Sequence, residues 1–208
     1  DILKTEPADR RFRSDLARQL LYIGVPMGLQ FSITAIGSIM LQSANNALGT
    51  ACVAAFTAAM RIKMFVMCPL DSLGMAMATY SGQNYGAGKP DRIWMGIKSA
   101  TLMMTVYVIA IGALMWGLAE KFALLFISPD ETEIIDDTAL FLHINISFFF
   151  LLGMLSILRY SIQGAGYTRL AMFSGVSEMV ARVLVSLIAV PLWGFWGVCF
   201  GEPTAWLV

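Results

Sequence analysis

Six long apolar stretches constrain this chain more than any other feature of its sequence. They lie at about 20–42, 51–80, 99–118, 138–163, 169–190 and from near 193 to 208. A helix of about 20 apolar residues can cross the hydrocarbon core of a bilayer, whereas strands are shorter and follow regular turn signals. The sequence therefore predicts an all-α, polytopic membrane helix bundle of six transmembrane helices, the last of them truncated.

The composition agrees with a membrane protein. Hydrophobic residues make up 58% of the 208 residues, and charged residues make up 13%, where soluble domains have roughly 25%. The formal net charge is zero, which gives no reason to expect a nucleic-acid partner. The three cysteines lie far apart in apolar stretches and are interpreted as small core residues. A single histidine argues against a metal site, and no cofactor is expected.

Basic residues predict the orientation of the helices. Nine lysines and arginines fall before the first span or in alternate loops, whereas Lys121 is the lone basic residue of the other loops. The nine are Lys4, Arg10, Arg11, Arg13, Arg18, Lys89, Arg92, Lys98 and Arg169. Basic loops remain on the cytoplasmic side. We therefore interpret residues 1–19 as a cytoplasmic linker and 20–208 as the membrane domain of a longer protein, since both ends of the sequence look cut.

The glycine-rich segment from Gly82 to Arg92 lies in one of these basic loops. It superficially suggests a phosphate-binding loop, because Lys89 follows a glycine. However, five residues rather than four separate Gly82 from Gly88, and Pro90 stands where a metal-binding hydroxyl is required. We interpret the segment as a tight cytoplasmic turn between two membrane helices, with Pro90 beginning the second.

Several segments carry a family resemblance. They read AAFTAAMRIKMF and GMAMATYSGQNYGAGKPDRI around the second span, GVPMGLQ in the first, IQGAGYT after the fourth and GFWGVCFGEPTAWLV in the sixth. Together they resemble the second half of the multidrug and toxic compound extrusion (MATE) family, from about residue 20 to the end. The resemblance implies two six-helix lobes that rock around a central cavity and export organic cations or drugs in exchange for protons or sodium.

On that resemblance, the chain is the C-terminal lobe of a plasma-membrane antiporter and not an enzyme. Its partners would be the N-terminal lobe, the lipid bilayer, small organic cations, and protons or sodium. One departure concerns coupling: sodium-coupled members place carboxylates in the first and fourth helices of this lobe, and this sequence has none there. Glu178 remains as a carboxylate near the middle of a span, and the missing lobe becomes a second candidate for ion coupling.

Charges inside the spans indicate where a site would lie, because a charge in the bilayer usually faces the bundle interior or a wet cavity. Glu178 and Arg182 are four residues apart in the fifth span, so they share a helix face and can pair. Two interpretations remain open. Either Glu178 exchanges a proton or cation while Arg182 tunes it, or the two form a permanent structural pair.

The second span contains Arg61, Lys63 and Asp71. Asp71 lies two to three turns beyond both basic residues, so its partner must come from another helix, and Arg159 is one candidate. Asp71 is then a cavity residue or a lock between lobes. Arg61 belongs to the candidate cavity set, although Arg61 and Lys63 could instead extend to the outer interface.

Two glutamines complete the candidate site. Gln30 in the first span and Gln163 at the end of the fourth are costly to bury, so we expect them to contact substrate or the facing lobe. Two other functions remain open. A lipid-linked oligosaccharide flippase of the same superfamily would need a strongly cationic cavity. A membrane-embedded enzyme would need clustered His, Cys, Asp or Glu, and this sequence scatters them.

Overall fold

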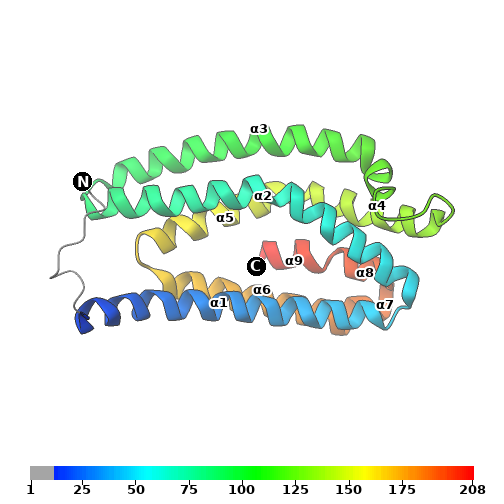
Figure 1. The fold of residues 1–208 in the computed structure, drawn as a ribbon, viewed down its shortest axis with the longest axis horizontal. Coiled ribbons are helices and arrows are strands. Elements are labelled where there is room, and N and C mark those ends of the chain that lie inside the picture. Colours follow the sequence, from blue (N-terminus) through cyan, green and yellow to red (C-terminus); the bar gives the residue numbers. More distant parts are fainter. Residues whose placement is uncertain (1–11) are drawn as a thin grey trace.

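The computed structural model describes residues 12–208, and these residues form a bundle of long helices (Figure 1). The α-helices are α1 (Ser14–Asn46), α2 (Thr50–Gly86), α3 (Pro90–Ala123), α4 (Thr132–Ser147), α5 (Phe149–Gly164), α6 (Thr168–Leu184), α7 (Val190–Trp193), α8 (Phe195–Cys199) and α9 (Gly201–Leu207). A π-helical turn, η1 (Val185–Ala189), joins α6 to α7. No strand occurs among the described residues, which confirms the all-α prediction.

The predicted spans correspond to these helices, with different ends. Three single helices, α1, α2 and α3, are long and apolar enough to cross a membrane, as is the continuous run Thr168–Trp193. The α4–α5 pair makes a fifth span if the two bent helices are counted together as one membrane crossing. The sixth apolar stretch forms the short helices α8 and α9. Residues 14–19, predicted as linker, belong to α1, and the rest of the predicted linker up to residue 11 lies outside the described residues.

Close packing of α1 against α6 depends on two glycines. A β-carbon on Gly37 would lie 3.0 Å from the Cα of Met179, and one on Gly175 would lie 2.8 Å from Cγ of Gln30. Small residues let membrane helices approach closely where apolar burial alone gives no attraction between them. The two helices consequently run side by side along one edge of the bundle (Figure 1).

The second helix continues through Pro69, which cannot donate a backbone N–H to the preceding turn. The carbonyl that lacks this donor is that of Phe65, four residues earlier. At the adjacent residue, the hydroxyl of Tyr107 from α3 donates a 2.7 Å hydrogen bond to the backbone carbonyl of Val66. The bond therefore holds α3 against the proline-containing part of α2.

The fourth apolar stretch is broken, which its continuous hydropathy does not predict. The axes of α4 and α5 differ by 51° at Phe148. Just before the break, Ser147 donates to the carbonyl of His143 at 2.7 Å, and Asn145 donates to that of Phe141 at 2.9 Å. Side chains that bond back to their own helix compete with its backbone ladder and often bend it.

The helices form two layers with the last helix between them. The pair α1–α6 makes one layer, and α2, α3, α4 and α5 make the other, while α9 packs on both α6 and α5 (Figure 1). Gly194, whose φ is +58°, reverses the chain after α7 and so directs α8 and α9 back into the bundle. This arrangement places the polar residues of α9 in the interior.

Candidate functional site

Five charged side chains form a continuous chain of ion pairs through the interior. Within α6, Arg182 Nη1 lies 3.4 Å from Glu178 Oε2. The same arginine contacts Glu202 of α9, with 3.2 Å between Nε and Oε1. Glu202, Glu178 and Arg182 are all at least nine-tenths buried. The predicted Glu178–Arg182 pair therefore exists as part of a larger network.

Each end of the network has a further cation. Arg159 of α5 donates from Nη2 to Glu178 Oε1. Lys63 of α2 places Nζ 3.1 Å from Glu202 Oε2. The network thus crosses both layers through α5, α6, α9 and α2. Buried ions persist at low dielectric only when paired and hydrogen-bonded, which these contacts provide.

Aromatic rings surround the buried lysine. Nζ of Lys63 lies 5.8 Å from the ring centroid of Phe141 and 5.7 Å from that of Trp206. Only 4% of the lysine is exposed. A cation over an aromatic face is attracted by the ring quadrupole, most strongly where water is excluded. The prediction that Lys63 could extend to the outer interface is therefore wrong.

A cavity of about 160 Å³ opens beside the network. Charged side chains of both signs line it, together with the apolar or aromatic groups of Met67, Tyr160 and Trp206. Asp71 is among the lining residues and is half-buried, yet among residues 12–208 it makes no ion pair. The suggested Asp71–Arg159 pair is not formed, because Arg159 contacts Glu178 instead.

The two predicted glutamines meet within the same cavity. Gln163 Nε2 donates a 2.6 Å hydrogen bond to Gln30 Oε1, which joins α5 to α1. The remaining oxygen, Gln163 Oε1, is buried without a partner among the described residues, as are Thr34 Oγ1 and Arg159 Nε. Buried polar atoms are rarely left unpaired. These three atoms are therefore available to a ligand or to water in the cavity.

Most of the predicted site residues come together, with one exception. Glu178, Arg182, Gln30, Asp71, Gln163 and Arg159 all line this cavity. Arg61 does not: it is exposed and lines a separate surface hollow with Glu131 and Phe126. Since Arg61 and Lys63 point in different directions on α2, only one of them can face the network. The expectation that Arg61 belongs to the cavity is corrected on this geometry.

Sequence reasoning missed Glu202 as a site residue. It named Glu178 as the remaining carboxylate near the middle of a span, although the sixth apolar stretch also contains one. The rule that an ionisable residue in a membrane span faces the interior applies equally to Glu202.

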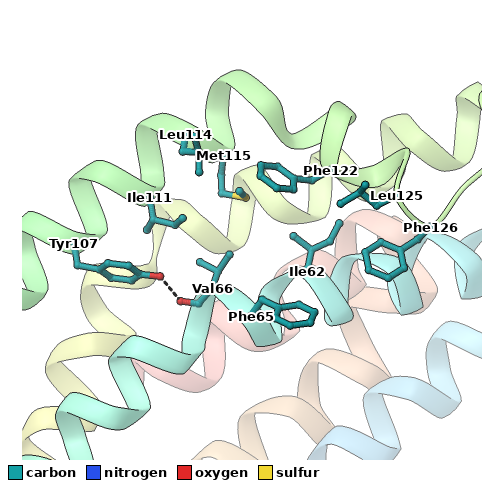
Figure 2. A pocket seen from close by; sticks show the side chains of 10 residues that line it. All are labelled: Ile62, Phe65, Val66, Tyr107, Ile111, Leu114, Met115, Phe122, Leu125 and Phe126. Carbon is teal, nitrogen blue, oxygen red and sulfur yellow. Dashed lines mark hydrogen bonds between the residues drawn. The ribbon is translucent and has the colours of Figure 1, made fainter.

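A second pocket, of about 370 Å³, lies between α2, α3 and the segment that follows α3, and its lining is apolar apart from one tyrosine hydroxyl (Figure 2). Ile62, Phe65 and Phe122 contribute to its walls, and its one hydroxyl, on Tyr107, is already bonded to Val66. It contains no charged group that could distinguish ions. The polar cavity is therefore the better candidate site. Within residues 12–208 no cluster of His, Cys, Asp and Glu could hold a metal.

Comparisons with known proteins identify the family of this chain. The sequence model of the MatE family matches residues 24–188, which is most of the chain. The chain belongs to the MatE family. This is the predicted family, and its members are transporters rather than enzymes.

One curated relative is the probable multidrug resistance protein YoeA of Bacillus subtilis. It is 25% identical over 195 residues, which cover 91% of this chain and 41% of the relative. The crystal structure of a MATE protein in a bent conformation superposes with a TM-score of 0.88 at 22% identity, over 100% of this chain and 46% of that one. A MOP superfamily transporter from Pyrococcus furiosus, described as having a binding pocket of reverse polarity, gives 0.80 at 12% identity, over 91% and 42%.

The lengths of these matches show how much of a whole transporter this chain covers. The chain spans less than half of the relatives and structures it matches. Its fold is consistent with one lobe of a two-lobe transporter, as predicted. Structural likeness at such identities shows the fold alone, and the substrate and coupling ion depend on the chemistry of the cavity itself.

Proposed function

We propose that this chain is the C-terminal lobe of an antiporter that exports organic cations in exchange for protons or sodium. The observation that supports the proposal is the charge balance of the ion-pair network together with the cavity beside it. Three cations, Lys63, Arg159 and Arg182, contact only two carboxylates, Glu178 and Glu202. Asp71 is the third carboxylate and balances the site, yet it pairs with no described residue.

Asp71 can therefore act as the exchangeable group. A monovalent organic cation would find a carboxylate to neutralise and, nearby, the rings of Tyr160 and Trp206 and the thioether of Met67. Binding of a proton or sodium ion at Asp71 removes the attraction that holds the substrate. Competition for one carboxylate then couples ion entry to substrate release.

The ion-pair network has a different role in this proposal. It ties α2, α5, α6 and α9 together through buried contacts. Elements linked in this way move as one body, which alternating access by rocking of two lobes requires. Glu178, which two arginines hold, belongs to this rigid frame more than to the exchange step.

A lipid-linked oligosaccharide flippase receives less support. A pyrophosphate would require a strongly cationic cavity, whereas two arginines and three carboxylates line this one, and the nearby Lys63 is paired with Glu202. Asp71 also lines the cavity as a carboxylate that has no ion-pair partner among the described residues, and its negative charge would repel an anion.

The test is transport by the complete transporter that contains this chain, reconstituted in proteoliposomes with a fluorescent organic cation. We expect efflux to follow an imposed proton or sodium gradient. Asp71→Asn should abolish the gradient dependence, whereas Asp91→Asn, a matched change at an exposed position at the start of α3, should leave it intact. Gradient-driven efflux that survives in Asp71→Asn would overturn the exchange role of Asp71. Transport of a lipid-linked sugar, with no cation efflux, would overturn the exporter proposal.

A further inference from the structure

A polar groove of about 490 Å³ lies at the α2–α3 turn and shares no lining residue with the cavity. Its lining includes Tyr80, Gln83, Asn84, Lys89, Arg92 and Met95. We refer to this hollow as the turn groove. It lies where α2 ends and α3 begins, and both helices are long and apolar enough to cross a membrane. The turn groove is therefore at the membrane surface.

The walls of the turn groove are built into the fold. A side chain at Gly96 would collide with the Tyr80 ring, so this glycine lets the ring lie against α3. The Tyr80 hydroxyl then donates a 3.1 Å hydrogen bond to the carbonyl of Arg92. The turn itself is closed by the Lys89 N–H, which donates to the carbonyl of Asn84 at 2.9 Å, and Gly88 adopts a φ of +67°.

The charge of the turn groove is positive. Lys89 and Arg92 both line it, and no acidic side chain does so among the described residues. Asp91 lies between them in the sequence but is exposed on the first turn of α3 and is not part of the lining. The amide of Gln83 adds a neutral donor. These donors suit a phosphate group, which accepts charge-assisted hydrogen bonds from arginine and lysine.

The surface next to the turn groove is apolar, which selects a lipid over a free ion. Trp94 and Met95 are 62% and 66% exposed on the first turns of α3. Farther along the same helix, Leu102, Val106 and Ile109 are exposed too. Tryptophan favours the level of the lipid headgroups, and basic pockets at membrane surfaces bind anionic headgroups. An amphiphile could place its phosphate in the groove and its acyl chains along α3.

We propose that the turn groove binds the phosphate headgroup of an anionic phospholipid, held by Lys89 and Arg92 with the acyl chains against α3. This site is separate from the transport cavity and does not rest on the proposed function. Lipid binding is measured without any transport, so failure of one proposal leaves the other unaffected.

The experiment titrates the delipidated complete transporter with phosphatidylglycerol or phosphatidylcholine and counts bound lipids by native mass spectrometry. The test variant is Lys89→Gln with Arg92→Gln. The matched control is Arg18→Gln with Arg169→Gln, which removes two exposed cations near the same end of the bundle, where Arg169 stacks on Tyr22. A third variant, Lys89→Arg with Arg92→Lys, keeps both charges and shows that the turn tolerates substitution.

We expect the test variant to weaken phosphatidylglycerol binding about tenfold more than the control does. Both variants lose the general attraction of two surface cations to anionic lipid, whereas only the test variant also loses the charge-assisted hydrogen bonds from the groove to the phosphate. The charge-preserving variant should bind as the native sequence does. Equal losses in the test and control variants, or no loss in either, would overturn the proposal. Displacement of phosphatidylglycerol by inorganic phosphate at millimolar concentration would also overturn it, because the groove would then be a site for free anions.

Discussion

Arg182 of α6 holds Glu202 of α9 through two guanidinium nitrogens, with Nε 3.2 Å from Oε1 and Nη2 3.4 Å from Oε2. The planar fork of arginine matches a carboxylate in this way, which adds directional specificity to the attraction. Both side chains are buried. The contact therefore fixes the last helix against α6, and the stability of the lobe should depend on it.

Glu202→Gln should destabilise the complete transporter by about 3 kcal/mol. The change leaves Lys63 buried without a carboxylate, and breaking a buried pair from one side costs roughly 3–5 kcal/mol. Thermal unfolding in detergent measures the effect. The matched control is Glu120→Gln, at an exposed position near the end of α3, which should leave the melting temperature unchanged.

The same network allows a sharper test by a double substitution. Lys63→Met combined with Glu202→Gln removes both members of one pair, so the double variant should be less destabilised than the sum of the two single variants. Simple additivity of the two effects would show that the Lys63–Glu202 contact contributes no coupling.

Close helix packing gives a second prediction. Gly175→Val should destabilise the protein by about 1–3 kcal/mol, the usual cost of overpacking, because even a β-carbon there would lie 2.8 Å from Gln30 Cγ. Gly112→Val on α3 is the control, since no neighbouring atom lies within 4 Å of an added β-carbon. Both variants can be compared by their melting temperatures in detergent. Equal melting temperatures of the two variants would mean that the close packing of α1 against α6 contributes nothing to stability.

The helices themselves could be predicted from the sequence, and the break within one of them could not. Apolar runs longer than a bilayer requires leave few alternatives to membrane helices, and the structure contains them. The bend at Phe148 depends on the back-bonding of Ser147 and Asn145, which hydropathy does not register. Asn145 also lies 3.4 Å from the carbonyl of Cys199, a contact that requires knowledge of the tertiary fold.

Most residues of the candidate site could be predicted from the sequence, but only some of the ion pairs between them could. Spacing placed Glu178 and Arg182 on one helix face, which suffices for a pair within one helix. Arg159 pairs with Glu178 and not with Asp71, and this pairing depends on how α2, α5 and α6 are rotated about their axes. Sequence spacing within one helix contains no information about that rotation.

The hydroxyl of Tyr107 supports a third prediction. Tyr107→Phe removes the hydrogen bond to the Val66 carbonyl, close to Pro69, and should cost about 0.5–1.5 kcal/mol. Tyr22→Phe is the matched control at an exposed position, where the ring that stacks on Arg169 is kept. Both can be measured as shifts in the thermal melt. An unchanged melt for Tyr107→Phe would mean that water serves the carbonyl equally well.

The orientation of the bundle gives the last prediction. We propose that the basic α2–α3 turn faces the cytoplasm of a plasma-membrane protein, and that the acidic segment between α3 and α4 faces outward. Ala87→Cys and Asp130→Cys place exposed thiols on the two sides, in a background with Cys52, Cys68 and Cys199 replaced by alanine. Because the chain matches only part of its relatives, the complete transporter is the protein to label.

An impermeant maleimide added to intact cells should label the thiol of Asp130→Cys and leave that of Ala87→Cys unmodified until the membrane is permeabilised. The alanine background without either new cysteine controls for unspecific labelling. Labelling of Ala87→Cys in intact cells, with protection of Asp130→Cys, would reverse the orientation and place the turn groove on the outer leaflet. That result would contradict the cytoplasmic assignment while leaving the lipid-binding prediction testable on the other side.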